Sequence, residues 1–500
     1  MSRTDGGPAR AVHPDAPATS RRWWILGLIG LAQLMVMLDS TIVNIALPSA
    51  QADLGFADGD RQWVITAYAL AFGGLLLLGG RISDMFGRRR VFLTGLVGFA
   101  LASALGGAAP SFGLLLTARA LQGAFAALLA PSARSLLVTT FTEPRERAKA
   151  FGVFGGIAGA GGAIGLLLGG VLTQGFSWRW TLYVNVALAL VALAGAVRLL
   201  PREGRDRAVR LDVPGVLLVS SALFGLVYGL SDATTHTWGA PATWGPLTAG
   251  ALLLVAFTWW QTRAAQPLLP LGILLDRTRA ASYLTVLVSG AGVFGVFLFV
   301  TYYLQGTLGY SPTRTGLAFL PMVAVTMVVS VVASTSLLAR FGPRPVVPLG
   351  LAVSAGGMAW MTALGTGSTY AAHLLPPLLL AGVGMGLSTA PAISLATYGV
   401  APRDAGVSSA AVSTMQQIGG SVGTALFNTM ATTAVTHYLT SHPAHTPTTL
   451  ARANIHGYAT AYWWAAGVFA LGAILTFALH RPGRLRAPEG ERDAQHSGAH

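Results

Sequence analysis

The sequence has no cysteine and few charged residues, and each shortage excludes a class of protein or site. With no cysteine among 500 residues, disulfides, thiolate metal sites and cysteine nucleophiles are excluded. Only 10% of the residues are charged, whereas a soluble protein carries about a quarter. Lysine occurs once, at Lys149, so arginine carries nearly all the positive charge. The 53% of hydrophobic residues that remain indicate an integral membrane protein.

Long apolar stretches recur along most of the chain and predict an all-α membrane protein with fourteen spans. The first follows a polar stretch ending in Arg21 and Arg22 and has no small-residue cleavage site, so we expect an uncleaved helix. The expected spans are 23–47, 62–80, 91–109, 112–140, 148–173, 180–199, 213–231, 245–262, 280–304, 314–338, 345–364, 371–397, 405–436 and 457–479.

The basic residues indicate which loops face the cytoplasm. With the N-terminus inside, all but six of the 32 Lys and Arg residues fall in cytoplasmic segments. This bias predicts a multi-pass protein of the inner (plasma) membrane with both termini in the cytoplasm. The net charge of +14 is therefore scattered over loops and forms no patch for nucleic acid. The exceptions are Arg61, Arg179, Arg314 and Arg452 in external loops, and Arg119 and Arg134 within spans.

The order of spans and loops predicts two six-helix bundles with two helices inserted between them. An internal echo supports this division: Asp84 and Gly87 follow the second span, while Ala339 and Gly342 follow the tenth, which is the second of the later bundle. Paired halves of this sort place substrate near the midplane between them. The expected units are a tail 1–22, a bundle 23–199, a linker 200–212, two helices 213–262, a bundle 280–479 and a tail 480–500.

The loop GGRISDMFGRRR, from Gly79 to Arg90, combines glycines for a tight turn with an acid and a basic cluster. Asp84 can lie against a helix N-terminus or an arginine, and the arginines hold the cytoplasmic side. A simple basic stop-transfer loop would explain the arginines but not the spacing. The spaced residues are Gly80, Asp84, Gly87, Arg88 and Arg89.

Asp39 is the one carboxylate that lies well inside a span. An ionised carboxylate in hydrocarbon is costly, so such acids face a cavity or a partner. Asp39 lies nine residues before Pro48 on an outward helix, and Arg119 lies eight after Ser111 on an inward helix. At 1.5 Å per residue, both are roughly 12 Å below the outer surface. We expect Asp39 and Arg119 to couple protons to transport; the alternative is a structural ion pair without proton traffic.

Other polar and aromatic groups within spans can line a substrate path or form interhelical hydrogen bonds, and the sequence favours neither. Arg134, near the inner end of its span, is explained by snorkelling to the cytoplasm. The path candidates are Asn44, Tyr68, Gln122, Tyr302, Gln416, Gln417 and Asn428.

Glycines recur every three or four residues in the span 148–173. Such a stripe lets a neighbouring helix approach closely. The residues are Gly155, Gly159, Gly162, Gly165, Gly169 and Gly170.

Together these motifs resemble the major facilitator superfamily, and within it the fourteen-helix drug:proton antiporter family. The loop fits the superfamily signature G-x-x-x-D-x-x-G-R-R; LDSTIVNIALP resembles a first-helix motif, and RALQG matches R-x-x-Q-G at Arg119 and Gln122. The resemblance implies that this loop is a conformational latch, made by Gly80, Asp84, Gly87, Arg88 and Arg89. In it, Asp84 would contact the start of the span 405–436, near Arg403 to Gly406. Leu166 stands where the family's antiporter motif usually has proline, which weakens the assignment as an antiporter.

The resemblance implies a secondary transporter that exports small hydrophobic or cationic compounds, such as drugs, antibiotics and dyes, in exchange for protons. An exporter of one metabolite or a proton-coupled importer would have the same fold. A transport-silent sensor or membrane enzyme is the alternative from another class, but no positioned nucleophile, metal-ligand spacing or P-loop is present. We expect a bacterial monomer without cofactor or metal, whose partners are protons, a small-molecule substrate and the lipid bilayer.

Overall fold

The computed structural model describes residues 19–56, 60–201, 211–232, 240–265, 267–269, 271–400, 404–442 and 446–481, and these residues form helices and loops without a strand. The first part contains α1 (Thr19–Leu54), α2 (Arg61–Phe86), α3 (Arg88–Gly107), α4 (Phe112–Thr140), α5 (Pro144–Gly175) and α6 (Trp180–Leu199). Then come α7 (Val213–Asp232), α8 (Pro241–Gln261) and the short α9 (Leu271–Leu275). The last part contains α10 (Arg277–Tyr302), η2 (Tyr303–Thr307), α11 (Pro312–Val332), η3 (Ala333–Leu337), α12 (Leu338–Phe341), α13 (Pro343–Met361), η4 (Tyr370–Leu374), α14 (Leu375–Ala396), α15 (Ala405–Ser441) and α16 (Pro447–Leu479).

Twelve helices of the described part are long and apolar enough to cross a membrane. The two remaining predicted spans coincide with α13 and α15, which are not among the twelve. Prolines and an arginine at the start of α13, and many Ser, Thr and Gln residues in α15, explain the difference, because they lower the mean hydropathy. The count of fourteen spans therefore stays a prediction.

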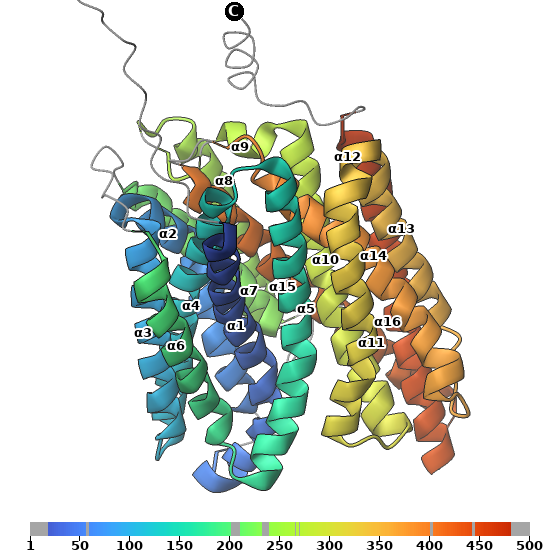
Figure 1. The fold of residues 1–500 in the computed structure, drawn as a ribbon. Coiled ribbons are helices and arrows are strands. Elements are labelled where there is room, and N and C mark those ends of the chain that lie inside the picture. The colour runs from blue at the N-terminus through green and yellow to red at the C-terminus, as the bar shows by residue number, and fades with distance from the viewer. Residues whose placement is uncertain are drawn as a thin grey trace, which may run out of the picture.

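The helices α1–α6 form one bundle and α10–α16 a second bundle beside it (Figure 1). Between them in sequence, α7 packs on α8 and also contacts α2 and α15. Because the long helices alternate in direction, α1 begins and α16 ends on the same side of the molecule, at the top of Figure 1. This side is called the terminal side below, and the other the distal side.

Two loops on the terminal side share an unusual backbone conformation. Gly87, between α2 and α3, has φ +91°, and Gly342, between α12 and α13, has φ +81°. Side chains other than glycine rarely adopt this region. The structural likeness of the two positions agrees with the internal echo in the sequence.

The glycine stripe of α5 contacts two different neighbours. On the terminal half, Gly155 faces Ala390 of α14 in the other bundle, and at mid-helix Gly162 faces the Phe297 ring of α10. On the distal half, Gly165 and Gly169 lie against α1 within their own bundle. A Cβ added to Gly155 or Gly162 would lie 3.3 Å from its neighbour, so α5 packs closely on both bundles. Gly170 is buried, and the surroundings of Gly159 lie outside the described part.

Candidate functional site

A buried polar network surrounds Asp39 in the first bundle. One carboxylate oxygen, Oδ2, accepts a hydrogen bond from Arg119 Nη1 at 2.6 Å. The other, Oδ1, accepts from Asn185 Nδ2 at 2.7 Å and from Gln122 Nε2 at 3.1 Å. Asp39 is 0% and Arg119 1% exposed, so the pair lies fully inside the protein.

Further bonds hold the donors of this network in place. Arg119 Nε donates to the Val64 carbonyl of α2 at 3.2 Å, and Nη1 also donates to Gln122 Oε1 at 2.8 Å. Gln122 Nε2 reaches Ser103 Oγ of α3 at 2.7 Å. Five helices of one bundle, α1, α2, α3, α4 and α6, therefore meet around a single negative charge.

The structure brings the side chains of Asp39, Arg119 and Gln122 together, as the sequence indicated for Asp39 and Arg119. It adds Asn185, which the sequence reasoning missed, although a lone asparagine in an apolar span five residues from the distal end of α6 was a usable signal. Tyr68 also belongs here, because the Arg119 guanidinium lies 4.5 Å from the centre of its ring. The Asn44 side chain lies outside what the structure describes.

An arrangement of this kind can hold either a charge or a proton. The buried carboxylate accepts hydrogen bonds from one guanidinium and two amide donors, which compensate a negative charge. Protonation would remove that compensation and leave a buried guanidinium without its counter-charge, which is costly. The charged and the protonated form of Asp39 would therefore require different surroundings.

A second contact joins the two bundles on the terminal side. Asp84 Oδ1 accepts a hydrogen bond from the Gly406 N–H at 2.9 Å, and Oδ2 accepts from the Val407 N–H at 3.1 Å. These are orphan amides at the N-terminus of α15, where a carboxylate is favoured. Asp84 thus lies against the helix start that the family resemblance implied; Arg403 itself lies outside the described residues.

Small residues allow this inter-bundle contact. A Cβ on Gly80 would lie 2.7 Å from the Gly406 carbonyl oxygen, and a Cβ on Gly406 would lie 2.5 Å from Asp84 Oδ1. Arg89, in contrast, donates to the Val197 carbonyl at the end of α6 at 2.9 Å. This hydrogen bond lies within the first bundle, and the part of Arg89 in a latch between the bundles stays a prediction.

The sequence suggested that Arg134 snorkels toward water, but the structure shows that it does not. Its side chain is buried (3% exposed) between α4 and α15. Nη1 donates to Ser413 Oγ, and Nη2 donates to Gln416 Oε1 at 3.0 Å, so the guanidinium joins the two bundles. The snorkelling interpretation was wrong because Arg134 lies on the side of α4 that faces the other bundle. Gln416 therefore accepts a hydrogen bond from Arg134 in this conformation. Its neighbour Gln417 lies near Gly73 of α2.

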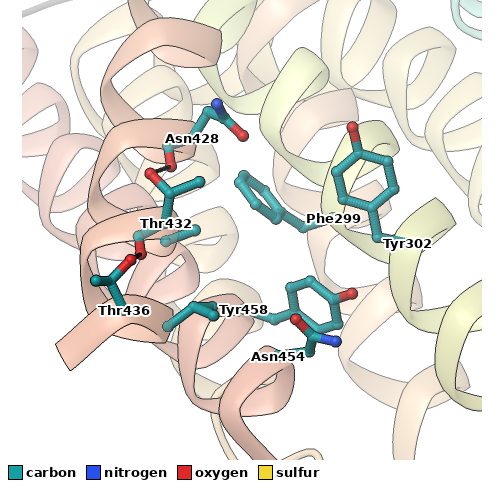
Figure 2. A pocket seen from close by; sticks show the side chains of 9 residues that line it. Phe299, Tyr302, Asn428, Thr432, Thr436, Asn454 and Tyr458 are labelled. Atoms are coloured by element: carbon teal, nitrogen blue, oxygen red, sulfur yellow. Dashed lines mark hydrogen bonds between the residues drawn. The ribbon is translucent and has the colours of Figure 1, made fainter. Parts of the chain in front are cut away.

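A pocket opens between α10, α15 and α16 toward their distal ends (Figure 2). It has a volume of about 310 Å³ and contains two of the predicted path residues, Tyr302 and Asn428. Aromatic rings lie on one side and the hydroxyl groups of α15 on the other (Figure 2). The lining residues are Phe299, Tyr302, Asn428, Ala431, Thr432, Val435, Thr436, Asn454 and Tyr458, none of which is charged.

Comparison with known proteins gives the family. Residues 29–424 match the family model described as Major Facilitator Superfamily. A puromycin resistance protein of Streptomyces alboniger is 52% identical over 92% of this chain and 91% of its own length. A cephamycin export protein of Amycolatopsis lactamdurans is 41% identical over 82% and 85%.

The fold has a counterpart of known structure. The human organic anion transporter MFSD10 matches with a TM-score of 0.60 over 91% of this chain and 99% of that one, at 16% identity, which shows likeness of fold alone. The predicted fold class is confirmed, and the chain is a multi-pass membrane transporter with bacterial relatives rather than an enzyme. Because the family model covers most of its length, this chain belongs to the major facilitator superfamily.

Proposed function

We propose that this transporter exports small organic compounds, antibiotics among them, in exchange for protons by alternating access. The names of its relatives support antibiotics as the first class to test, because they include puromycin resistance, cephamycin export and lincomycin resistance. The single observation that carries the proton coupling is the enclosed Asp39, held by Arg119, Gln122 and Asn185.

Coupling follows from the two states of Asp39. A proton that enters from the distal side binds the carboxylate, removes its charge and frees Arg119 from its strongest acceptor. The network must then rearrange, because an unpaired buried guanidinium is costly. Release of the proton on the terminal side restores the ion pair. The bonds that change all lie within the bundle 23–199, which moves against the bundle 280–479.

The terminal side is the cytoplasmic side in this proposal, because most basic residues belong to it. Both termini are then cytoplasmic. The contacts of Asp84 and Arg134 with α15 close the path on that side, so the conformation is one with a sealed cytoplasmic gate. The protein works as a monomer, since each bundle pairs with the other within one chain.

The test is proton exchange by purified protein in liposomes, with puromycin as the first substrate. Wild type should take up puromycin against a gradient when protons flow the other way, and collapse of the proton gradient should stop the transport. Asp39→Asn should retain the fold but lose proton-driven transport. Asp53→Asn is the matched control, because it makes the same change on the same helix at a half-exposed ion pair with Arg179.

Two outcomes would contradict the proposal. If Asp39→Asn exchanges protons for puromycin at the wild-type rate, Asp39 is not the coupling residue. If the wild type moves neither puromycin nor any compound of a wider antibiotic and dye panel, the chain is not an exporter of this class.

A further inference from the structure

The Arg134 guanidinium is a buried charge whose partners are all neutral. Ser413 Oγ and Gln416 Oε1 accept its hydrogen bonds, and Nε has no partner among the described residues. Within the described part of the chain, no carboxylate forms an ion pair with it. Burying an unpaired charge is expensive, and hydrogen bonds to neutral groups offset only part of that cost.

Arg134 lies one layer deeper in the protein than the Asp84 contact. Ser413 follows Gly406 by seven residues on α15, which places the two contacts about 10 Å apart along the helix. Asp84 therefore closes the terminal end of the path, and Arg134 closes the next level toward the membrane centre.

Opening this gate changes the surroundings of Arg134 completely. Both of its acceptors belong to α15, while the arginine belongs to α4 of the other bundle. When the bundles part on the terminal side, the guanidinium loses both partners at once. Its donors then face the path by which a compound would enter, and they require new acceptors.

We propose that Arg134 is a specificity-determining residue that binds a carboxylate, or a comparable acceptor oxygen, of the compound entering from the terminal side. This inference rests on the proposed export function and names its substrate class: amphipathic compounds that carry a carboxylate or a comparable acceptor oxygen. The planar guanidinium matches a carboxylate in geometry and charge. A permanent cation without an acceptor gains nothing at this position and is repelled by the like charge.

The test uses two dyes that differ at one group: rhodamine 110, which has a free carboxylate, and rhodamine 123, its methyl ester. Binding to purified full-length protein in nanodiscs is measured by fluorescence anisotropy. We expect wild type to bind rhodamine 110 about tenfold more tightly than rhodamine 123, as a charge-assisted contact would give. Arg134→Gln should abolish the preference and Arg134→Lys should retain part of it. Arg340→Gln, which removes an exposed charge at the terminal end of α12, should leave it unchanged.

A second variant links the preference to the gate. Asp84→Asn weakens the outer layer of the closed gate, so it should raise the affinity for rhodamine 110 by populating the open state. The dye preference should again vanish in Asp84→Asn/Arg134→Gln. These readouts measure binding, so a failure of proton-driven export leaves them intact.

Four results would overturn the inference. Equal affinity of wild type for the two dyes would do so, as would a preference that survives in Arg134→Gln. Absence of rhodamine 110 binding to both wild type and Asp84→Asn would mean that Arg134 only closes the gate. An equal loss of affinity for both dyes in Arg134→Gln would lead to the same conclusion.

Discussion

Gly80→Ala should open the gate on the terminal side without disturbing the Asp39 network. The added methyl group would lie 2.7 Å from the Gly406 carbonyl oxygen and 2.6 Å from the Ala410 Cβ, both on α15. The backbone oxygen cannot rotate away, so α15 must move. Overpacking of this kind costs about 1–3 kcal/mol.

That cost applies only while the two bundles are in contact, because both clashing atoms belong to the opposite bundle. The substitution therefore shifts the equilibrium toward the open gate by roughly 5- to 150-fold. The wild-type chain contains no cysteine, so a single thiol can be introduced without removing others. Ser413→Cys places it at a buried position on α15 that faces Arg134.

The assay is the rate at which a membrane-impermeant maleimide modifies Ser413→Cys from the terminal side. Gly80→Ala should raise this labelling rate by roughly 5- to 150-fold. Gly79→Ala controls for overpacking itself, because its methyl group would clash with the Ala127 backbone within the same bundle and not across the gate. Gly113→Ala is the neutral control, with no atom within 4 Å. If Gly80→Ala and Gly79→Ala change the melting temperature and the labelling rate equally, the glycine contact does not control the gate.

Two further predictions concern residues outside the spans. Burial favours the neutral form of Asp212, but four hydrogen bonds outweigh burial and hold the pKa of this carboxyl below its usual range; the donors belong to Trp260, Gly215, Gln261 and Leu268. Asp212→Ala leaves these donors unpaired and should lower the melting temperature. Asp212→Asn keeps the shape and one acceptor oxygen, so it should lower the melting temperature less. Burial lowers the pKa of His480 to about 4. Since the unfolded histidine titrates near 6.5, stability should be constant above that pH and fall by roughly 2 kcal/mol between pH 6.5 and 5. His480→Phe should remove this loss in thermal melts, and an unchanged pH dependence would contradict the assignment.

The sequence was sufficient for the charged pair but not for all of its surroundings. Asp39 and Arg119 could be paired because each lies in a span at a depth that residue counting gives. Asn185 was missed because an amide within a span has many possible partners, and only the rotation of α6 decides which one it meets. The same counting could have found it, since five residues from the distal end correspond to about 8 Å of depth.

Arg134 was misjudged for a related reason. Snorkelling assumes that a basic residue near a helix end faces lipid or water. Whether it does so depends on how the helix is rotated about its own axis. Residues fifteen apart on an α-helix lie within about 60° of each other around the axis. Arg134 therefore shares a side with Arg119, which already had to face the protein interior. The hydrogen bond of Arg89 could not be predicted either, because its acceptor is the backbone carbonyl of Val197, far away in the sequence.

Helix α4 carries residues of both the proposed proton site and the proposed gate, and this provides a route for coupling them. Arg119 and Arg134 are fifteen residues apart, about 22 Å along one helix, with Pro131 between them. Proline removes a backbone hydrogen bond, so the segment that carries Arg134 can bend relative to the rest. Asp39→Asn imitates the protonated state, frees Arg119 and should therefore raise the labelling rate of Ser413→Cys. Asp53→Asn should leave it unchanged. A labelling rate in Asp39→Asn equal to that of wild type, with Gly80→Ala still accelerating the reaction, would mean that the gate works but the proton site does not act on it through α4.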